Sequence, residues 1–171
     1  RDAKTSPPVL GVWSGVSSSV GTGHTCVLQL AGTVHGTPAH AAMPDTGADA
    51  LEAANHVLTA LDGERKKLRR IKSKSKGIGS PQLTVGLISG GINTNVVPDK
   101  IVMRLDRRLI PEENGKKVKR DLIALIKCAS KAKGIRSDCK RVILAAPLTP
   151  RKGLEGLMQP RTRSGKRELK P

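Results

Sequence analysis

Four short segments with strand character alternate with two segments of helical periodicity, and this order limits the possible folds more than any other feature. The expected strands are residues 25–34, 82–89, 100–108 and 139–146. They are rich in β-branched and aliphatic residues or alternate apolar with polar side chains. Strand, helix, strand, strand, helix, strand is the split βαβ order. The sequence therefore predicts an α+β, ferredoxin-like βαββαβ fold, a four-stranded antiparallel sheet with two helices on one face.

The two helical segments show apolar side chains three and four residues apart. Thr46 or Asp49 can cap the first helix. Its apolar residues are Leu51, Ala54, Leu58 and Leu61. The second helix follows Pro111, and Gly134 is a candidate C-cap. Its apolar residues are Val118, Leu122, Leu125, Ile126 and Ala129. Each pattern predicts a helix that buries one stripe against the sheet.

The predicted domain has to build its core from aliphatic side chains. The chain has 171 residues, which suits one domain of ordinary size, and it contains one Trp and no Phe or Tyr. Residues 1–23 are rich in Ser, Gly and Pro and are expected to be irregular. Residues 24–146 form the predicted domain, and residues 147–171 form a basic segment broken by prolines.

The formal net charge of +17 leaves two other classes of protein open. Basic residues gather in 65–76, in 116–141 and after residue 150, and such a charge attracts polyanions in a salt-dependent way. One alternative is a basic ferredoxin-like nucleic-acid-binding module. Proteins that read single strands stack bases on aromatic side chains, which this chain almost lacks, so we expect only non-specific nucleic-acid binding. The second alternative is an engineered, charge-enriched scaffold.

The cysteines indicate a reducing, cytoplasmic setting. Their number is odd and no two of them form a CxxC pair, which disfavours a disulfide framework. They are Cys26, Cys128 and Cys139. No apolar run is long enough to span a membrane, and no leader-like segment precedes the first strand, so we expect no membrane association.

We expect no metal or other cofactor in this chain. A hydrolytic zinc site needs three or four nitrogen, oxygen or sulfur ligands that converge on one point. The histidines are His24, His35, His40 and His56. No HExxH motif arranges them, and no nucleophile elbow, phosphate-binding loop or dinucleotide fingerprint is present.

Two turns rich in Gly and Pro carry the side chains best placed for chemistry. The turn at 36–44 holds His40 between an expected strand and an expected helix, and the turn at 90–99 holds Asn95 between two expected strands. Arg108 ends the third expected strand. Histidine and asparagine can each donate a hydrogen bond to a developing oxyanion, and arginine can hold a carboxylate with two parallel hydrogen bonds.

The spacing alone favours a purely structural role for these three residues. On that interpretation His40 caps its turn and Asn95 supplies a turn conformation. Arg108 pairs with Asp106 or with a glutamate. None of the three is a nucleophile, so the residues by themselves do not define a complete active site.

Three segments together resemble the lid, or dimerisation, domain of a family of dizinc amidohydrolases. They read HGTPAHAAMPDTGADA at 35–50, GGINTNVVPD at 90–99 and LDRRLIP at 105–111. The family includes acetylornithine deacetylase, succinyl-diaminopimelate desuccinylase, aminoacylase and related carboxypeptidases. The resemblance covers about residues 25–146, and its motifs fall in the family's order on the expected strand–helix–strand–strand frame.

The resemblance implies a role for each candidate residue. In that family the lid is inserted into a larger catalytic domain, and its histidine reaches into the active site of the partner subunit. The motifs place this role on His40, with Asn95 near the substrate carbonyl. Arg108, in an Asp-x-Arg pattern, would bind the substrate carboxylate. The residues that would shape the two turns are Gly36, Pro44, Gly47, Gly90, Gly91 and Pro98.

The resemblance also implies what the parent enzyme does and what this chain lacks. The parent would use two zinc ions to hydrolyse N-acyl amino acids or small peptides. The family's metal-ligand motifs, which lie before and after the lid, are not recognisable here. We therefore expect an excised lid domain that is inactive alone, with residues 147–171 leading toward a missing catalytic domain. Its expected partners are a second copy in a homodimer, that catalytic domain and a small carboxylate substrate.

Overall fold

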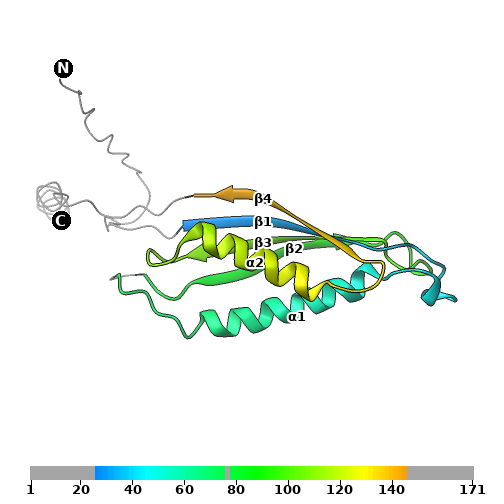
Figure 1. Cartoon of the computed structure of the whole chain (residues 1–171), viewed down its shortest axis with the longest axis horizontal. Coiled ribbons are helices and arrows are strands. Elements are labelled where there is room, and N and C mark those ends of the chain that lie inside the picture. The colour runs from blue at the N-terminus through cyan, green and yellow to red at the C-terminus, as the bar shows by residue number, and fades with distance from the viewer. Residues whose placement is uncertain (1–25, 76–77, 146–171) are drawn as a thin grey trace, which may run out of the picture. The chain divides into compact units, whose positions relative to one another are not determined.

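The structure confirms the α+β, ferredoxin-like fold. The computed structural model describes residues 26–75 and 78–145. Four strands form one antiparallel sheet in the order β2-β3-β1-β4, and both helices lie on the same side of it (Figure 1). The elements are β1 (Cys26–His35), the 3-10 helix η1 (Pro44–Thr46), α1 (Ala50–Leu68), β2 (Gln82–Gly90), β3 (Lys100–Leu109), α2 (Gly115–Ala129) and β4 (Arg136–Leu144). The expected terminal segments 1–23 and 147–171 and His24 lie outside the described residues, so the domain limits stay predictions.

The two central strands set the geometry of the whole sheet. β1 and β3 pair without a break, from Cys26 opposite Leu109 to His35 opposite Lys100. Alternate residues on both strands are buried, and those between them are more exposed. This pattern arises because the helices cover only one face of the sheet. The other face, which we call the open face, carries polar and charged side chains of β3.

The core under the helices is aliphatic, as the composition requires. Its most buried members come from both central strands and both helices. They include Leu28, Leu30, Val34, Val57, Leu61, Met103, Leu109 and Ile126. Burial of such side chains stabilises a fold by roughly 1.5–3 kcal/mol each, which compensates for the lack of large aromatic residues.

Side-chain caps explain where the helices begin. The Asp49 carboxylate accepts hydrogen bonds from the backbone N–H groups of Leu51 and Glu52, at 2.7 and 3.2 Å. Asp49 is therefore the cap of α1, and the alternative, Thr46, lies in the separate η1 turn. Asn114 caps α2 in the same way. Such caps satisfy backbone donors that have no partner inside the helix.

Two boundaries differ from the expectation by three residues or more. The C-cap of α2 is Ser130, whereas Gly134, with a φ of 75°, lies in the following turn. β4 begins at Arg136, three residues before the expected start. Its first half alternates charged residues with Ser and Cys, because an edge strand is exposed on one side and tolerates charge there. That composition hides the strand from a search for apolar alternation.

The described part of the chain has no helix that combines the length and the apolar character needed to cross a membrane. The three cysteines are free thiols: Cys26 is buried, Cys128 is exposed and Cys139 is half-buried. Burial raises the pKa of the Cys26 and Cys139 thiols, which disfavours their reactive thiolate form.

Candidate functional site

The turns that carry His40 and Asn95 lie side by side at one end of the sheet. His40 and Val96 form an isolated antiparallel bridge. Within it the Ala41 N–H donates to the Asn95 carbonyl at 2.9 Å, and the Val97 N–H donates to the Ala39 carbonyl at 2.8 Å. The fold thus brings together the two candidate residues that are far apart in the sequence.

In the turn at 36–44, which we call the histidine turn, the backbone comes so close to the segment at 47–48 that glycines are needed. The Thr37 N–H and the Ala48 carbonyl are 2.9 Å apart, and the Ala48 N–H returns a bond of the same length to the Thr37 carbonyl. A Cβ on Gly36 would lie 2.0 Å from the Ala48 carbonyl oxygen, and one on Gly47 would lie 2.6 Å from the Thr37 carbonyl oxygen. Pro44 occupies the first turn of η1, where its fixed φ suits a helical start. These contacts leave no room for larger residues at either glycine.

The turn at 90–99, which we call the asparagine turn, depends on two glycines in succession. Gly90 has a φ of 155° and Gly91 a φ of 77°, which L-residues with a Cβ rarely adopt. A Cβ on Gly90 would also lie 2.2 Å from the Lys100 carbonyl oxygen. Farther along, the Pro98 carbonyl accepts from the Ala50 N–H at 2.9 Å, which ties this turn to the start of α1. The asparagine turn is therefore held by the first turn of that helix.

The backbone around His40 determines which ring nitrogen faces solvent as a donor. The Ala42 N–H donates to His40 Nδ1 at 3.1 Å, so Nδ1 is an acceptor. In the neutral ring the proton then resides on Nε2. The side chain is exposed. A neutral His40 can consequently offer its Nε2–H to an external oxygen while Nδ1 holds the ring in place.

Asn95 is also exposed and contributes its backbone carbonyl, not its side chain, to the bridge. In residues 26–75 and 78–145, its amide group makes no hydrogen bond to protein. The neighbouring Asn93 instead stabilises the turn, because its Oδ1 accepts from the Thr94 N–H at 2.7 Å. The Asn95 residue thus lies in the turn paired with that of His40, and among the described residues its amide group has no hydrogen-bonding role in the fold.

Arg108 lies elsewhere, on the open face of the sheet at the opposite end of β3. Its Nε donates to Asp106 Oδ1 at 2.8 Å, and Asp106 Oδ2 accepts from Gln29 Nε2 at 3.1 Å. The ion pair with Asp106 is one that the structural interpretation anticipates. Because only Nε is engaged among the residues that the structure describes, both terminal nitrogens of the half-exposed guanidinium are able to hold a carboxylate there. We did not anticipate Gln29 from the sequence, although it shares the open face with Asp106, the residue opposite it.

Arg108 cannot share a small substrate with His40 of the same chain. His40 and Asn95 lie beyond the end of β3 that starts at Lys100, which is opposite His35. Arg108 is eight steps after Lys100 along the extended strand, and at ~3.4 Å per step the two residues are ~27 Å apart. One chain therefore presents two separate candidate half-sites, one at each end of the sheet.

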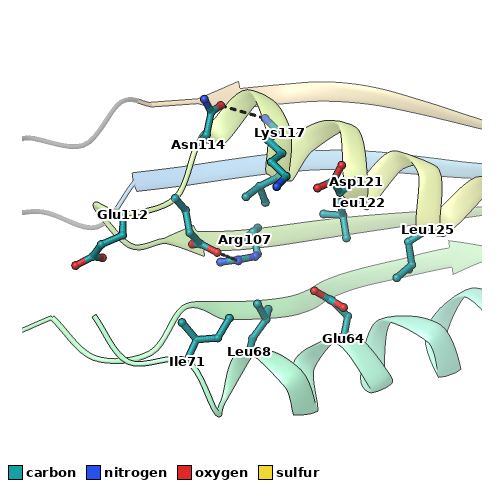
Figure 2. Close-up of a pocket in the computed structure, with 12 residues that line it drawn as sticks. Glu64, Leu68, Ile71, Arg107, Glu112, Asn114, Lys117, Asp121, Leu122 and Leu125 are labelled. Atoms are coloured by element: carbon teal, nitrogen blue, oxygen red, sulfur yellow. Dashed lines mark hydrogen bonds and ion pairs between the residues drawn. The ribbon is translucent and has the colours of Figure 1, made fainter. Parts of the chain in front are cut away.

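A hollow lies on the helix-covered side of the sheet, away from His40, Asn95 and Arg108. It is a groove of about 600 Å³ between α1 and α2 (Figure 2). Leu68 and Ile71 from one side and Leu122 and Leu125 from the other form its apolar walls. We keep the exposed turns and Arg108 as the candidate site, because none of His40, Asn95 and Arg108 lines the groove.

A buried ion pair closes one end of this groove. Arg107 Nη2 and Glu113 Oε1 are 2.6 Å apart, with the Arg107 side chain only 4% exposed. Glu113 Oε2 also accepts from the Ile110 N–H at 3.1 Å. The sequence indicates this pair through Arg107, which occupies a buried position of β3 between Leu105 and Leu109. A buried guanidinium requires an acidic partner.

The described residues do not fit a zinc site. No three His, Cys, Asp or Glu side chains gather closely enough in this part of the chain to hold a metal ion. His35 Nε2 faces Asp138 at 3.4 Å, and His40 Nδ1 is occupied by the backbone. The side chains at the two turns can donate hydrogen bonds but cannot by themselves provide a metal-bound nucleophile.

The fold and the motif turns define a known class of domain. Residues 22–133 match the family model described as "Peptidase dimerisation domain". The chain belongs to this family, which confirms the resemblance that the three motifs indicate.

Relatives and solved structures agree with this assignment. An N-acetyl-L-cysteine deacetylase of Bacillus subtilis is 30% identical over 127 residues, which are 74% of this chain and 29% of that protein. A probable carboxypeptidase of Uncinocarpus reesii is 33% identical over 90 residues, which are 52% of this chain and 20% of that protein. The aminopeptidase PepT of Bacillus cereus superposes with a TM-score of 0.64 at 15% identity, over 87% of this chain and 37% of that one. At that identity the structural likeness shows the fold alone.

The chain thus spans about a fifth to three tenths of the curated relatives it matches. The comparisons support a dimerisation domain of amidohydrolases and peptidases, and they do not support a nucleic-acid-binding module.

Proposed function

We propose that this chain is the lid and dimerisation domain of a zinc-dependent amidohydrolase that acts on N-acyl amino acids or small peptides. His40 and Asn95 donate hydrogen bonds to the oxyanion that forms when the amide carbonyl is attacked. Arg108 binds the carboxylate of the substrate. The relatives' names, a deacetylase and carboxypeptidases, support a substrate with an amide bond and a carboxylate.

The observation that carries this proposal is the pairing of the two turns. The bridge between His40 and Val96 brings the backbones of the two turns together, so that His40 and Asn95, both exposed and both able to donate to an oxygen, lie at the same end of the sheet. Removal of one oxyanion donor costs an enzyme roughly 100- to 1000-fold in turnover. Donors of this kind are useful only next to a reacting carbonyl, which another domain must hold.

The separation of the half-sites supports a homodimer. His40 and Asn95 of one chain lie too far from Arg108 of the same chain to contact one small substrate. A second copy related by a two-fold axis can supply the missing half-site, so the donors act in trans. We propose that the two zinc ions are bound by the catalytic domain of the parent and that the parent works in the cytoplasm. The free thiols are compatible with that location.

Subunit complementation of the full-length parent tests the proposal. His40→Ala should lower turnover at least about a hundredfold with folding intact. A second inactive variant, carrying a substitution in a metal ligand of the catalytic domain, is mixed with it. If His40 acts in trans, mixed dimers recover part of the activity because one active site then has all its groups. Absence of recovery in demonstrated mixed dimers contradicts the proposal.

Arg108 gives an independent readout of substrate choice. Arg108→Met should raise KM strongly for substrates with a free carboxylate and change little for the corresponding amides. Gln82→Met, at the exposed neighbouring position of β2, serves as the control and should leave this preference unchanged. Equal loss for both substrate types would contradict a carboxylate-binding role.

A further inference from the structure

We propose that Asp106 and Gln29 are positioning residues for Arg108, because together they fix its guanidinium so that the two terminal nitrogens are held ready for a carboxylate. The inference rests on the proposed function, since it concerns the residue to which that function assigns the substrate carboxylate. It gives a role in substrate binding to two residues that do not themselves touch the substrate.

The three side chains form one chain of hydrogen bonds across the two central strands. Arg108 Nε donates to Asp106 Oδ1 at 2.8 Å, and Gln29 Nε2 donates to Asp106 Oδ2 at 3.1 Å. Asp106 and Gln29 are register partners on β3 and β1, and Arg108 follows Asp106 by two residues on the same open face. Each oxygen of the carboxylate therefore has a donor, one from each strand.

The contact at Nε determines which edge of the guanidinium is available to a ligand. A guanidinium can hold a carboxylate through both terminal nitrogens, or through Nε and one terminal nitrogen. Since Asp106 occupies Nε, the arrangement that uses both terminal nitrogens is the one that is left. The ion pair thus selects one binding geometry in addition to balancing a charge.

Gln29 has a specific task because Asp106 lies between two arginines on its own strand. Arg104 and Arg108 are each two residues away from Asp106 on the open face. Among the described residues, Asp106 forms an ion pair with Arg108 and none with Arg104. A hollow of about 190 Å³ is lined by Arg104, Asp106 and Gln29 and leaves space in which an untethered carboxylate could turn. The bond from Gln29 to Oδ2 keeps the carboxylate directed toward Arg108.

The residues on either side of Arg108 do not compete for its guanidinium. Val27 on β1 and Gln82 on β2 are its register partners. Val27 is apolar, and the Gln82 side chain donates to the Ser80 carbonyl at 3.2 Å. In the part of the chain that the structure describes, Asp106 is the carboxylate that pairs with Arg108. Without Asp106 the guanidinium would have no fixed orientation there.

This restraint matters because the Arg108 side chain is long and 48% exposed. An exposed arginine samples many rotamers, and the loss of that freedom on binding opposes association. When Asp106 and Gln29 order the side chain in the free protein, substrate binding no longer has to do so. Removal of either residue should therefore weaken the binding of carboxylate substrates while the fold remains intact.

NMR of the 171-residue chain tests the restraint without any substrate. The Nε proton of Arg108 should exchange slowly with water, and Asp106→Ala should make this exchange at least about tenfold faster because the donor then faces solvent. Gln29→Met should accelerate it by a smaller factor. Asp138→Ala is the control, since it removes an open-face carboxylate that pairs with Arg136 Nε at 3.4 Å, and it should leave Arg108 unchanged.

Kinetics of the full-length parent test the consequence for the substrate. Asp106→Ala should raise KM for substrates with a free carboxylate at least about tenfold and leave turnover, and KM for the corresponding amides, nearly unchanged. Asp106→Asn keeps an oxygen that can accept from Nε and should recover part of the loss. Gln29→Met should act in the same direction with a smaller effect. Thr84→Val, on the other side of Asp106 in β2, is the matched control for Gln29 and should change nothing.

A double-mutant cycle distinguishes positioning from a purely structural cross-strand pair. In the Arg108→Met background, Asp106→Ala should have no further effect on KM, because Asp106 acts only through Arg108. Equal losses in both backgrounds would overturn the inference. Unchanged exchange of the Arg108 Nε proton in Asp106→Ala would overturn it as well.

The outcomes also separate this inference from the proposed function. If Arg108→Met abolishes the preference for carboxylate substrates but Asp106→Ala does not reduce it, the positioning role is wrong and the proposed function stands. If Arg108→Met leaves that preference unchanged, the proposed role of Arg108 is wrong, and the positioning role falls with it.

Discussion

The side chains of Arg107 and Glu113 form a buried ion pair of 2.6 Å that joins the end of β3 to the turn before α2. Arg107 projects from the helix-covered face of the sheet toward the groove (Figure 2). The pair is enclosed by protein, with the Arg107 side chain 4% and the Glu113 side chain 17% exposed. Such a pair contributes less to stability than its attraction suggests, but losing one partner is costly.

Glu113→Ala should lower the free energy of unfolding by about 3 kcal/mol, because it leaves the Arg107 charge buried without a partner. Urea unfolding followed by circular dichroism measures the loss. Asp121→Ala is the control, since its ion pair with Arg120 is 3.4 Å long and exposed. That change should stay within about 0.5 kcal/mol. Similar losses for both variants would contradict the structural importance of the buried pair.

Gly36→Ala should destabilise the domain by at least about 2 kcal/mol, because the new Cβ would press on a backbone carbonyl that cannot move freely. Gly63→Ala offers a matched comparison. Gly63 lies inside α1, and a Cβ there meets nothing within 4 Å. Alanine should raise the stability of this exposed helix position by about 0.5–1 kcal/mol. Thermal melts of the two variants should therefore shift in opposite directions, and a shift in the same direction would count against the observed turn.

Glu112 should titrate below the usual range of a glutamate. Hydrogen bonds from backbone N–H groups, first its own and then that of Lys74, lower the pKa of the Glu112 carboxyl, and the Ser73 hydroxyl adds to the effect. The folded-state pKa therefore lies below the unfolded-state value. The stabilisation from these contacts is complete above the unfolded-state pKa and is lost as the pH falls through the folded-state pKa.

Carboxyl NMR titration checks the shift. Ser73→Ala should move the pKa of Glu112 toward its ordinary value, because one donor to the carboxylate is removed. Ser80→Ala removes a hydroxyl that bonds the Arg69 carbonyl instead and serves as the control. The contact between residues 73–74 and Glu112 is contradicted if the Ser73 substitution leaves the titration unchanged.

His40→Ala should change the stability of the 171-residue chain by less than about 1 kcal/mol, as for other exposed positions. The substitution removes one acceptor, but the Ala42 N–H that it served is exposed and can bond to water. Asp49→Ala should lower the free energy of unfolding by about 1 kcal/mol, because it removes the cap of α1. This variant serves as the reference for a moderate loss of stability. A loss larger than that of the cap would make His40 a structural residue.

Much of the fold could be predicted because each element carries its own signal. The first helix can be recognised from the capping carboxylate of Asp49 and an apolar stripe. In β3, buried residues alternate with more exposed ones over the whole strand. The early start of β4 at Arg136 was missed because an edge strand need not be apolar on either side.

The sequence by itself determined the order of the elements, the aliphatic core and the identity of the residues in the two turns, because these follow from local propensity and composition. Only the tertiary structure decided which residues meet. The bridge at Val96 brings His40 beside Asn95, while the unbroken register of β1 and β3 keeps Arg108 at the other end of the sheet. Strand pairing joins segments distant in sequence, so these distances depend on the register of the whole sheet and not on the spacing of motifs along the chain.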